Sequence, residues 1–305
     1  IGGALVGRVL DTVLALAVYD PDDAIRRILF LALDTPVFRP ALAESRRLRT
    51  TGLALHDDSL QVQIIVVPLV GHLSQINPAV ALPMLRKLLL ALQMEIDPSS
   101  PLASHHAAHV SRRHHLPRHH SNPHPHHTVH TARTPRLSHS TLRPLAVAAA
   151  STHTLRTTQA ANAAAAGVPA SFPRAYERHR QEGAARLLRL LARSCPRLLC
   201  TYALPILTSL LAKLRASAHA PTTAELLLTL GELLTVTPRS LEPQAQELLE
   251  LLVDALQNAT ASSSKARAAL FALEALLSCV SPAALDPPPY ERFPSLLATL
   301  LAFLA

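Results

Sequence analysis

The sequence is poor in aromatic residues: only 3% of its 305 residues are Phe, Tyr or Trp, and tryptophan is absent. Hydrophobic residues nevertheless make up 49% of the chain. Most of them are leucine and alanine, which favour helices over strands. The composition therefore predicts an all-α protein.

Cysteine is scarce as well, and its spacing excludes a disulfide framework or a zinc ribbon. The three thiols, Cys195, Cys200 and Cys279, form no C-x-x-C pair. We expect them to be buried, reduced cysteines of a cytoplasmic protein.

Long hydrophobic runs are also missing. The best uncharged and largely apolar window lies between Arg197 and Lys213, and it is shorter than the about 18 residues that a membrane-spanning helix needs. Arg8 and Asp11 interrupt the first apolar stretch, so it does not resemble a secretory signal. We therefore predict no membrane span. Both ends of the sequence lie in apolar runs, and we expect an internal fragment of a longer protein or a partial gene model.

Acidic residues are absent from one long segment, residues 98–176, which holds eight arginines. The net charge is +8, with 29 basic and 21 acidic residues in the chain. Subtracting the eight arginines leaves 21 basic residues against 21 acidic ones outside the segment. The basic character belongs to this segment, so it does not predict a general nucleic-acid-binding surface.

A repeat is present on both sides of that segment. Helix-like apolar stretches are broken by prolines at four similar places, Pro78, Pro196, Pro238 and Pro282. The last three prolines are 42 and 44 residues apart, close to the period of about 40–47 residues in HEAT and armadillo repeats. The interval of 118 residues from Pro78 to Pro196 exceeds one period by about 75 residues. The acid-free segment lies in this interval and is predicted to be an insert.

The predicted fold is an all-α HEAT/armadillo-type α-α superhelical solenoid interrupted by a disordered insert. Leucines at helical spacing predict helix pairs over residues 22–55, 59–96, 180–215, 222–257 and 262–304. Ser, Thr and Asp in the breaks at residues 20–23, 56–59, 220–223 and 261–264 are predicted to cap the following helices. The predicted domains are helical repeats over 1–97, a low-complexity His/Pro/Ala/Arg-rich insert over 98–178, and further repeats over 179–305.

The insert contains 13 histidines and nine prolines within residues 98–176, a composition typical of disorder. The histidines at 105, 106 and 109, and those at 124, 126 and 127, offer a metal site as an alternative. They lack the cysteines and closed ligand geometry of structural zinc sites and the glutamate of zinc proteases. Its arginines offer nucleic-acid binding as a second alternative, but Phe172 and Tyr176 are the only aromatic residues there. An inert loop and a translated intron are the remaining interpretations.

Sequence motifs of catalysis are missing: there is no phosphate-binding loop, no kinase catalytic loop and no nucleophile elbow. We nominate no catalytic, cofactor-binding or metal-ligating residue and expect no cofactor in this segment. The cluster Asp22, Asp23, Arg26 and Arg27 is expected to form hydrogen bonds between units, with a ligand site as the alternative. We expect His56 and His72 to be structural.

The run from Val70 to Leu90, VGHLSQINPAVALPMLRKLLL, resembles the solenoid of target of rapamycin (TOR) kinases, members of the phosphatidylinositol-3-kinase-related family. Further pieces resemble that family in the same order, at residues 20–26, 184–214, 229–233 and 290–297. The insert has no counterpart in it, and Gln63 stands where a basic residue is usual. A disturbed contact between units at the insert is therefore one expectation.

The resemblance implies a non-catalytic scaffold segment of a serine/threonine kinase that controls growth in response to nutrients. It implies docking of a raptor-like regulatory subunit, a possible homodimer of the full-length parent, and a cytoplasmic location with peripheral association to endomembranes. ATP and Mg²⁺ are implied only for a kinase domain outside this chain. No nucleic acid is expected as a partner. The alternative is an unrelated HEAT adaptor, such as a phosphatase scaffold or a transport receptor.

Overall fold

Residues 2–98, 171–260 and 262–303 are described by the structure, a computed structural model of the chain. Every regular element within these ranges is a helix, which confirms the predicted all-α fold. The insert's predicted disorder and its histidine clusters lie outside the described residues. The division into residues 1–97, 98–178 and 179–305 stays a prediction.

The helices described before the insert include three long ones, α1, α5 and α6, with shorter helices between α1 and α5. They are α1 (Gly2–Tyr19), α2 (Asp23–Leu33), α3 (Arg39–Leu42), α4 (Ser45–Leu53), the 3-10 helix η1 (Ala54–His56), α5 (Leu60–Ile76) and α6 (Pro78–Ile96).

Long helices, some of them separated by short ones, also follow the insert. They are α9 (Ser171–Ser194), α10 (Pro196–Ala216), α11 (Ala220–Val236), α12 (Pro238–Leu241), η2 (Glu242–Gln244), α13 (Ala245–Gln257), α14 (Ser264–Cys279), η3 (Pro282–Leu285), α15 (Pro289–Arg292) and α16 (Leu296–Ala302). All of these helices, apart from the first turn of α9, belong to one compact unit, which comprises residues 1–104 and 175–305.

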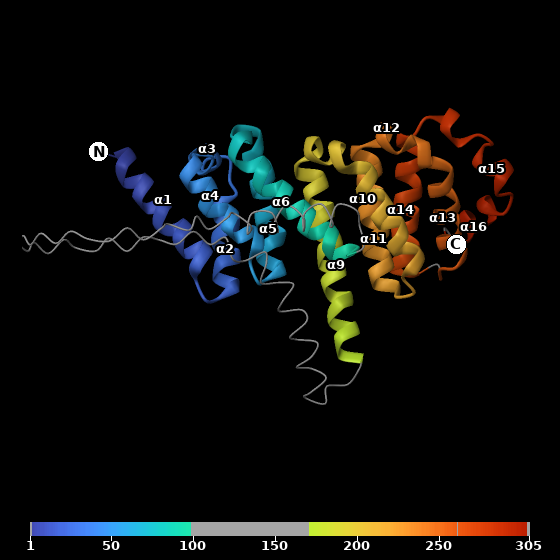
Figure 1. Cartoon of the computed structure of the whole chain (residues 1–305), viewed down its shortest axis with the longest axis horizontal. Coiled ribbons are helices and arrows are strands. Elements are labelled where there is room, and N and C mark those ends of the chain that lie inside the picture. The colour runs from blue at the N-terminus through green and yellow to red at the C-terminus, as the bar shows by residue number, and fades with distance from the viewer. Residues whose placement is uncertain (1, 99–170, 261, 304–305) are drawn as a thin grey trace, which may run out of the picture. The chain divides into compact units, whose positions relative to one another are not determined.

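Within this unit the helices stack in chain order (Figure 1). The first helices of successive repeats, α2, α5, α9, α11 and α14, form one layer, and the second helices, α4, α6, α10 and α13, form the other. Helix α1 packs against α2 and α4. Because each helix buries leucines against its partner and the next repeat, the core is continuous from Leu10 to Leu296. The predicted HEAT-type solenoid is thereby confirmed.

Prolines mark the starts of the second helices, as the repeat analysis predicted. Pro78, Pro196 and Pro238 are each the first residue of a helix, a position where the missing N–H costs no hydrogen bond. Pro282 begins the 3-10 helix η3.

Two helix starts differ from prediction. Helix α11 begins at Ala220, so Thr222 and Thr223 lie in its first turn and do not precede it. Helix α9 begins at Ser171, ahead of the predicted start at residue 180. Its extra turns carry little apolar periodicity, but Arg180 lies over the ring of Tyr176, 5.8 Å from its centroid. Tyr176 and Arg180 are four residues apart, and a side-chain contact at this spacing stabilises a helix even where no apolar face is buried.

Side-chain caps are present at two of the predicted breaks. Asp22 accepts a hydrogen bond from the backbone N–H of Ala24, and Ser263 accepts one from Ala266. Ser59 occupies the N-cap position of α5 but makes no such bond.

We expect Ser263→Ala to lower the free energy of unfolding by about 1 kcal/mol, because it leaves one N–H of the first turn of α14 unpaired. Urea denaturation followed by circular dichroism measures this change. Ser264→Ala, at the next position, is the control and should have a near-neutral effect, since Ser264 is exposed and accepts no cap bond.

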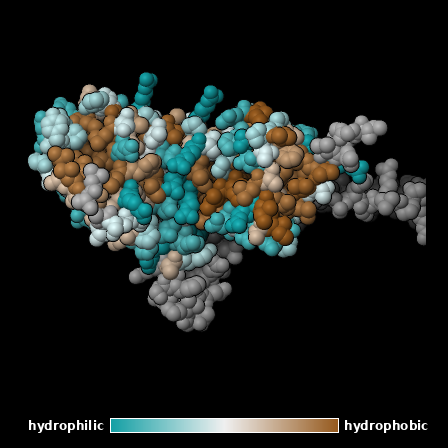
Figure 2. All heavy atoms as spheres, turned by 180° about the vertical axis from the view of Figure 1, so that it is seen from behind, coloured by the Kyte–Doolittle hydropathy of each residue, from teal (hydrophilic) through white to brown (hydrophobic). Residues whose placement is uncertain are grey.

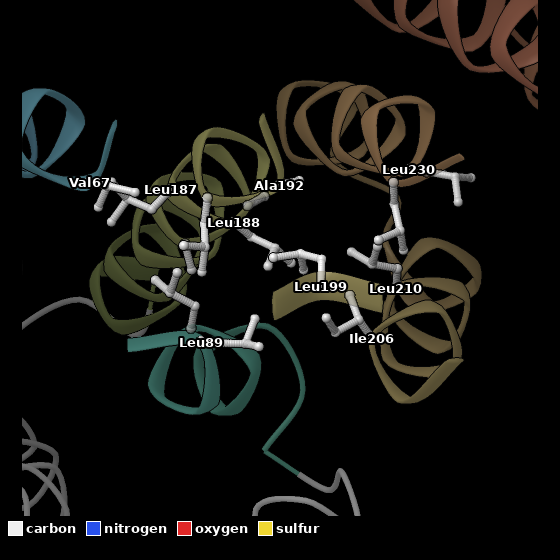
Figure 3. Packing of buried hydrophobic residues seen from close by; sticks show 14 of the residues in the cluster. Val67, Leu89, Leu187, Leu188, Ala192, Leu199, Ile206, Leu210 and Leu230 are labelled. Carbon is white, nitrogen blue, oxygen red and sulfur yellow. The ribbon is translucent and has the colours of Figure 1, made fainter. Parts of the chain in front are cut away.

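The repeat continues directly across the insert. In Figure 3, Leu187 and Leu188 of α9 face Val67 of α5 and Leu89 of α6, and all four side chains are at most 3% exposed. The side-chain amide of Gln93 on α6 donates to Ser209 Oγ on α10 at 3.2 Å. The expectation of a disturbed inter-unit contact is therefore wrong: the stacking faces on the two sides meet, because lengthening a connection adds little to the free energy of loop closure.

Helix α10 corrects the length argument against a membrane span, while the absence of a span stays a prediction. It has 21 residues and an 18-residue window of mean hydropathy 1.3, long and apolar enough by length and composition to cross a membrane. Among the described helices it is the one that passes this test, and 44% of the window is buried inside the protein. It packs against α6 and α11, as a core helix does, so composition alone is weak support for a span.

The cysteines are all free, and their burial differs from prediction at one position. Cys195 is buried, as expected, and its Sγ lies 3.7 Å from the Oγ of Ser74 on α5. Cys279 is partly exposed and Cys200 is exposed. The prediction of buried thiols is therefore wrong for Cys200, which the helical turn of α10 places on the solvent side.

Candidate interaction surfaces

An ionic network joins the first helices of two repeats, α2 and α5. The guanidinium of Arg26 donates to both carboxylate oxygens of Asp57, from Nε at 2.9 Å and from Nη2 at 2.8 Å. Its Nη1 donates to the backbone carbonyl of Asp20 at 2.7 Å. The side chains of Arg26 and Asp57 are 12% and 6% exposed. The hydrogen bonds to Asp57 raise the pKa of Arg26 above its usual value.

The same network includes residues at the starts of α2 and α5. Asp57 Oδ1 accepts from the backbone N–H of Ser59, and Ser59 Oγ donates to Asp23 Oδ2, both at 2.8 Å. Gln63 of α5 donates to the backbone carbonyl of Asp57 at 2.8 Å, which holds the connection that carries Asp57 against the start of α5. This confirms the predicted inter-unit hydrogen bonds for Asp23 and Arg26.

Asp22 and Arg27 have different roles from that prediction. Asp22 caps its own helix, and Arg27 is exposed. The alternative of a ligand site would use the open depression lined by Pro21, Asp22, Asp23, Arg26, Asp58 and Ser59. Asp22, Asp23, Arg26 and Ser59 already form hydrogen bonds within the protein, which leaves little for a ligand to satisfy.

A second set of ion pairs joins α9 to α11 at a separation of one repeat. Arg186 donates to Glu225 Oε1 at 2.8 Å, and Arg189 lies 3.4 Å from Glu225 Oε2. Arg193 Nε donates to Glu232 at 2.6 Å. Burial lowers the pKa of Arg189 from its usual value. Figure 2 shows a hydrophilic band down the middle of this face, at the place of α9.

The two histidines singled out from the sequence lie at helix or loop positions, as expected. His72 Nδ1 is 3.6 Å from Asp34 Oδ1, beyond hydrogen-bond distance. The pKa of His56 is lowered, first because the protein displaces water around the ring and then because Lys87 is nearby. No group of three His, Cys, Asp or Glu residues in the described part of the chain has the arrangement of a metal site.

An apolar face is exposed on the first two helices. Ile25, Ile28 and Leu31 of α2 are 43%, 59% and 54% exposed, and Leu16 and Tyr19 of α1 are 49% and 69% exposed. In Figure 2, hydrophobic residues gather to the right of the hydrophilic band, on the side of the N-terminal helices. Apolar faces of this kind commonly contact other proteins or further helices.

Stacked helix pairs with inter-unit hydrogen bonds at a separation of one repeat define the chain as a HEAT-type helical-repeat protein. Particular relatives can be named within that class. The chain is 26% identical over 301 residues to the serine/threonine-protein kinase TOR of rice and 24% identical over 302 residues to mTor of Drosophila melanogaster. It is 36% identical over 91 residues to TOR2 of Saccharomyces cerevisiae. No protein-family model matches the chain.

These similarities confirm the resemblance predicted from the sequence: over nearly its whole length the chain is similar to a segment of TOR kinases. The rice and fly matches cover 97% and 98% of this chain, and hence both helical blocks. The chain spans only 9% of the length of each of these two relatives and 4% of yeast TOR2.

Proposed function

We propose that this chain is a non-catalytic scaffold segment of a TOR-type serine/threonine protein kinase and docks a raptor-like regulatory subunit in nutrient and growth signalling. The observation that carries the proposal is the match to TOR kinases over nearly the whole chain. The kinase activity of the proposed parent is inferred from those relatives, which are named as serine/threonine-protein kinases. ATP and Mg²⁺ would bind to a domain of the parent that lies outside this segment.

The physical character of the fold supports a docking role. A repeat stack presents a long surface built from successive units, each held by its neighbours. Here the ion pairs Arg186–Glu225 and Arg193–Glu232 join neighbouring first helices, and Arg26–Asp57 joins α2 to the connection that leads into α5. Such a surface is preorganised, so a partner that binds it spends little free energy on ordering the scaffold.

The proposed setting follows the same resemblance. The parent would work in the cytoplasm with peripheral attachment to endomembranes and would form a homodimer. The second candidate function, an unrelated HEAT adaptor, is favoured by the repeat architecture alone. Reading the coding sequence downstream separates the two, because a kinase domain supports the first candidate and a stop codon after further repeats supports the second.

Crosslinking of the parent kinase in complex with its raptor-like subunit tests the docking role. The described residues contain three lysines, Lys87 on α6, Lys213 on α10 and Lys265 on α14. We expect at least one of them to form crosslinks to the regulatory subunit, identified by mass spectrometry. A complex that crosslinks elsewhere on the kinase, and at none of these three lysines, would contradict the proposal.

A further inference from the structure

Four cationic side chains on the second-layer helices α4 and α6 are exposed and have no carboxylate partner. They are Arg46, Arg49, Arg86 and Lys87, here named the second-layer basic patch. No carboxylate of the described residues lies within ion-pair distance of them. They differ in this from their neighbour Arg47, which pairs with Asp11 and Glu44.

Contacts along the two helices show that α4 and α6 lie side by side and run in the same direction. At their beginnings, Asn77 donates to the backbone carbonyl of Ala43 at 2.9 Å. Further along, a Cβ added to Gly52 would lie 2.4 Å from Met84 Sδ. Just beyond the end of α4, His56 of η1 is close enough to Lys87, in the middle of α6, to be affected electrostatically. The cations of the two helices therefore face a common surface.

Helical periodicity places these cations on the outer side of the layer. Leu48 and Leu85 are 0% exposed and point into the core. Arg49 and Arg86 follow them by one residue and Lys87 follows Leu85 by two, so their side chains turn away from the core. Arg46 precedes Leu48 by two residues and points outward as well.

The first three helices of this layer carry an excess of positive charge. Helices α4, α6 and α10 together carry eight Arg and Lys residues and a single carboxylate, Glu95. Glu95 is already ion-paired with Arg180 of α9. The next second-layer helix, α13, has the opposite character, with Glu247, Glu250 and Asp254 and no cation. Two of the eight cations are paired with carboxylates outside these helices, Arg47 with Asp11 and Glu44 and Arg215 with Glu247. The second-layer basic patch lies among the cations that remain, so the positive potential is highest over α4 and α6.

Two other classes of partner fit this surface less well. Arg86 covers the ring of Tyr202, 5.7 Å from its centroid, so this aromatic ring is not free to stack on a nucleic-acid base. Leu53 is the one large apolar side chain of α4 and α6 that is exposed, at 49%. A membrane-binding face needs a broader apolar anchor.

We propose that the second-layer basic patch binds an acidic segment of a partner protein. The inference rests on the proposed docking function and adds the surface and the chemistry of recognition. Aspartate and glutamate side chains would provide the carboxylates that Arg46, Arg49, Arg86 and Lys87 lack within the chain. Because all four cations are exposed, such an interface forms quickly and weakens as salt is raised.

Fluorescence anisotropy of a labelled oligoglutamate peptide, titrated with the whole chain at low salt, tests the proposal. We expect Arg49→Glu combined with Lys87→Glu to weaken peptide binding about tenfold or more, because each change replaces an attraction with a repulsion. The matched control combines Lys265→Glu with Arg267→Glu on α14, which changes the net charge equally. The arginines of residues 98–176 are the same in all three proteins.

Equal weakening in the test and control variants would overturn the proposal, because binding would then follow total charge. Stronger binding of single-stranded RNA or of phosphatidylserine vesicles, lost in the Arg49→Glu/Lys87→Glu variant, would assign the patch to another partner class. Circular dichroism confirms that each variant folds.

Crosslinking separates this inference from the proposed function. If the parent kinase with Arg49→Glu and Lys87→Glu still crosslinks to its raptor-like subunit through Lys213 or Lys265, docking uses another surface. That result would overturn the patch as its binding site and leave the proposed function intact. If no crosslink forms in the unaltered kinase while the peptide binding is confirmed, the proposed function fails and the patch stands.

Discussion

Replacing Gly71 with valine is expected to lower the free energy of unfolding by about 3 kcal/mol, at the upper end of the usual cost of overpacking. A Cβ at this position would lie 2.4 Å from both Cβ and Oγ of Ser194 and 3.2 Å from the Ser194 carbonyl carbon. The last of these atoms belongs to the backbone and cannot rotate away. Urea denaturation of the whole chain, monitored by circular dichroism, measures the loss.

Gly183→Ala is the control at the same α5–α9 junction. Its Cβ would meet the methyl groups of Leu60 at 3.4 and 3.5 Å, which is ordinary contact. Because alanine favours a helix over glycine, we expect a gain of about 0.5–1 kcal/mol. Gly71 and Ser194 meet only if the repeat closes over the insert, so an unchanged stability of Gly71→Val would contradict the stacking of α5 on α9.

Asp57→Ala is expected to cost about 2 kcal/mol, because it leaves the Arg26 guanidinium with little exposure and without its bidentate partner. It also removes the acceptor for the backbone N–H of Ser59. The cost is smaller than for a fully buried pair because the network lies at the rim of an open depression. Differential scanning calorimetry, or urea denaturation, measures the loss.

A double-mutant cycle with Arg26→Met isolates the pair. We expect the combined variant to be more stable than Asp57→Ala alone, because no unpaired guanidinium remains. Asp58→Ala serves as the control: Asp58 is exposed and should change stability by no more than about 0.5 kcal/mol. Strictly additive losses in the cycle would show that Arg26 and Asp57 do not interact.

Much of the fold is predictable because its signals are local. Pro78, Pro196 and Pro238 begin helices because proline cannot donate the hydrogen bond that a helix interior needs. Their spacing also located the repeat that resumes after the insert. The prolines inside helices, Pro68, Pro83 and Pro205, do not mark breaks. The leucine pattern around them outweighs the lost bond.

The candidate surfaces were less predictable from sequence. The Asp22–Arg27 cluster was found because charged residues gather at one helix start, but its partner Asp57 comes from the next repeat. The second-layer basic patch was missed, since Arg49 and Lys87 are 38 residues apart in the sequence. The run Arg46-Arg47-Leu48-Arg49 was a usable signal. It did not reveal that Arg47 is neutralised by Asp11 while its neighbours are not.

By itself, the sequence determined the all-α class, the repeat marked by prolines and the resemblance to TOR kinases. These features depend on residue composition and on spacing along the chain, because the residues that form and break helices act over only a few positions. Only the tertiary structure decided which charges pair, that Gly71 must lack a side chain, and which cations of α4 and α6 stay free. Those outcomes depend on contacts between residues that are about one repeat or more apart in the sequence. The packing of buried leucines between repeats brings these residues together, and no local sequence pattern records which of them meet.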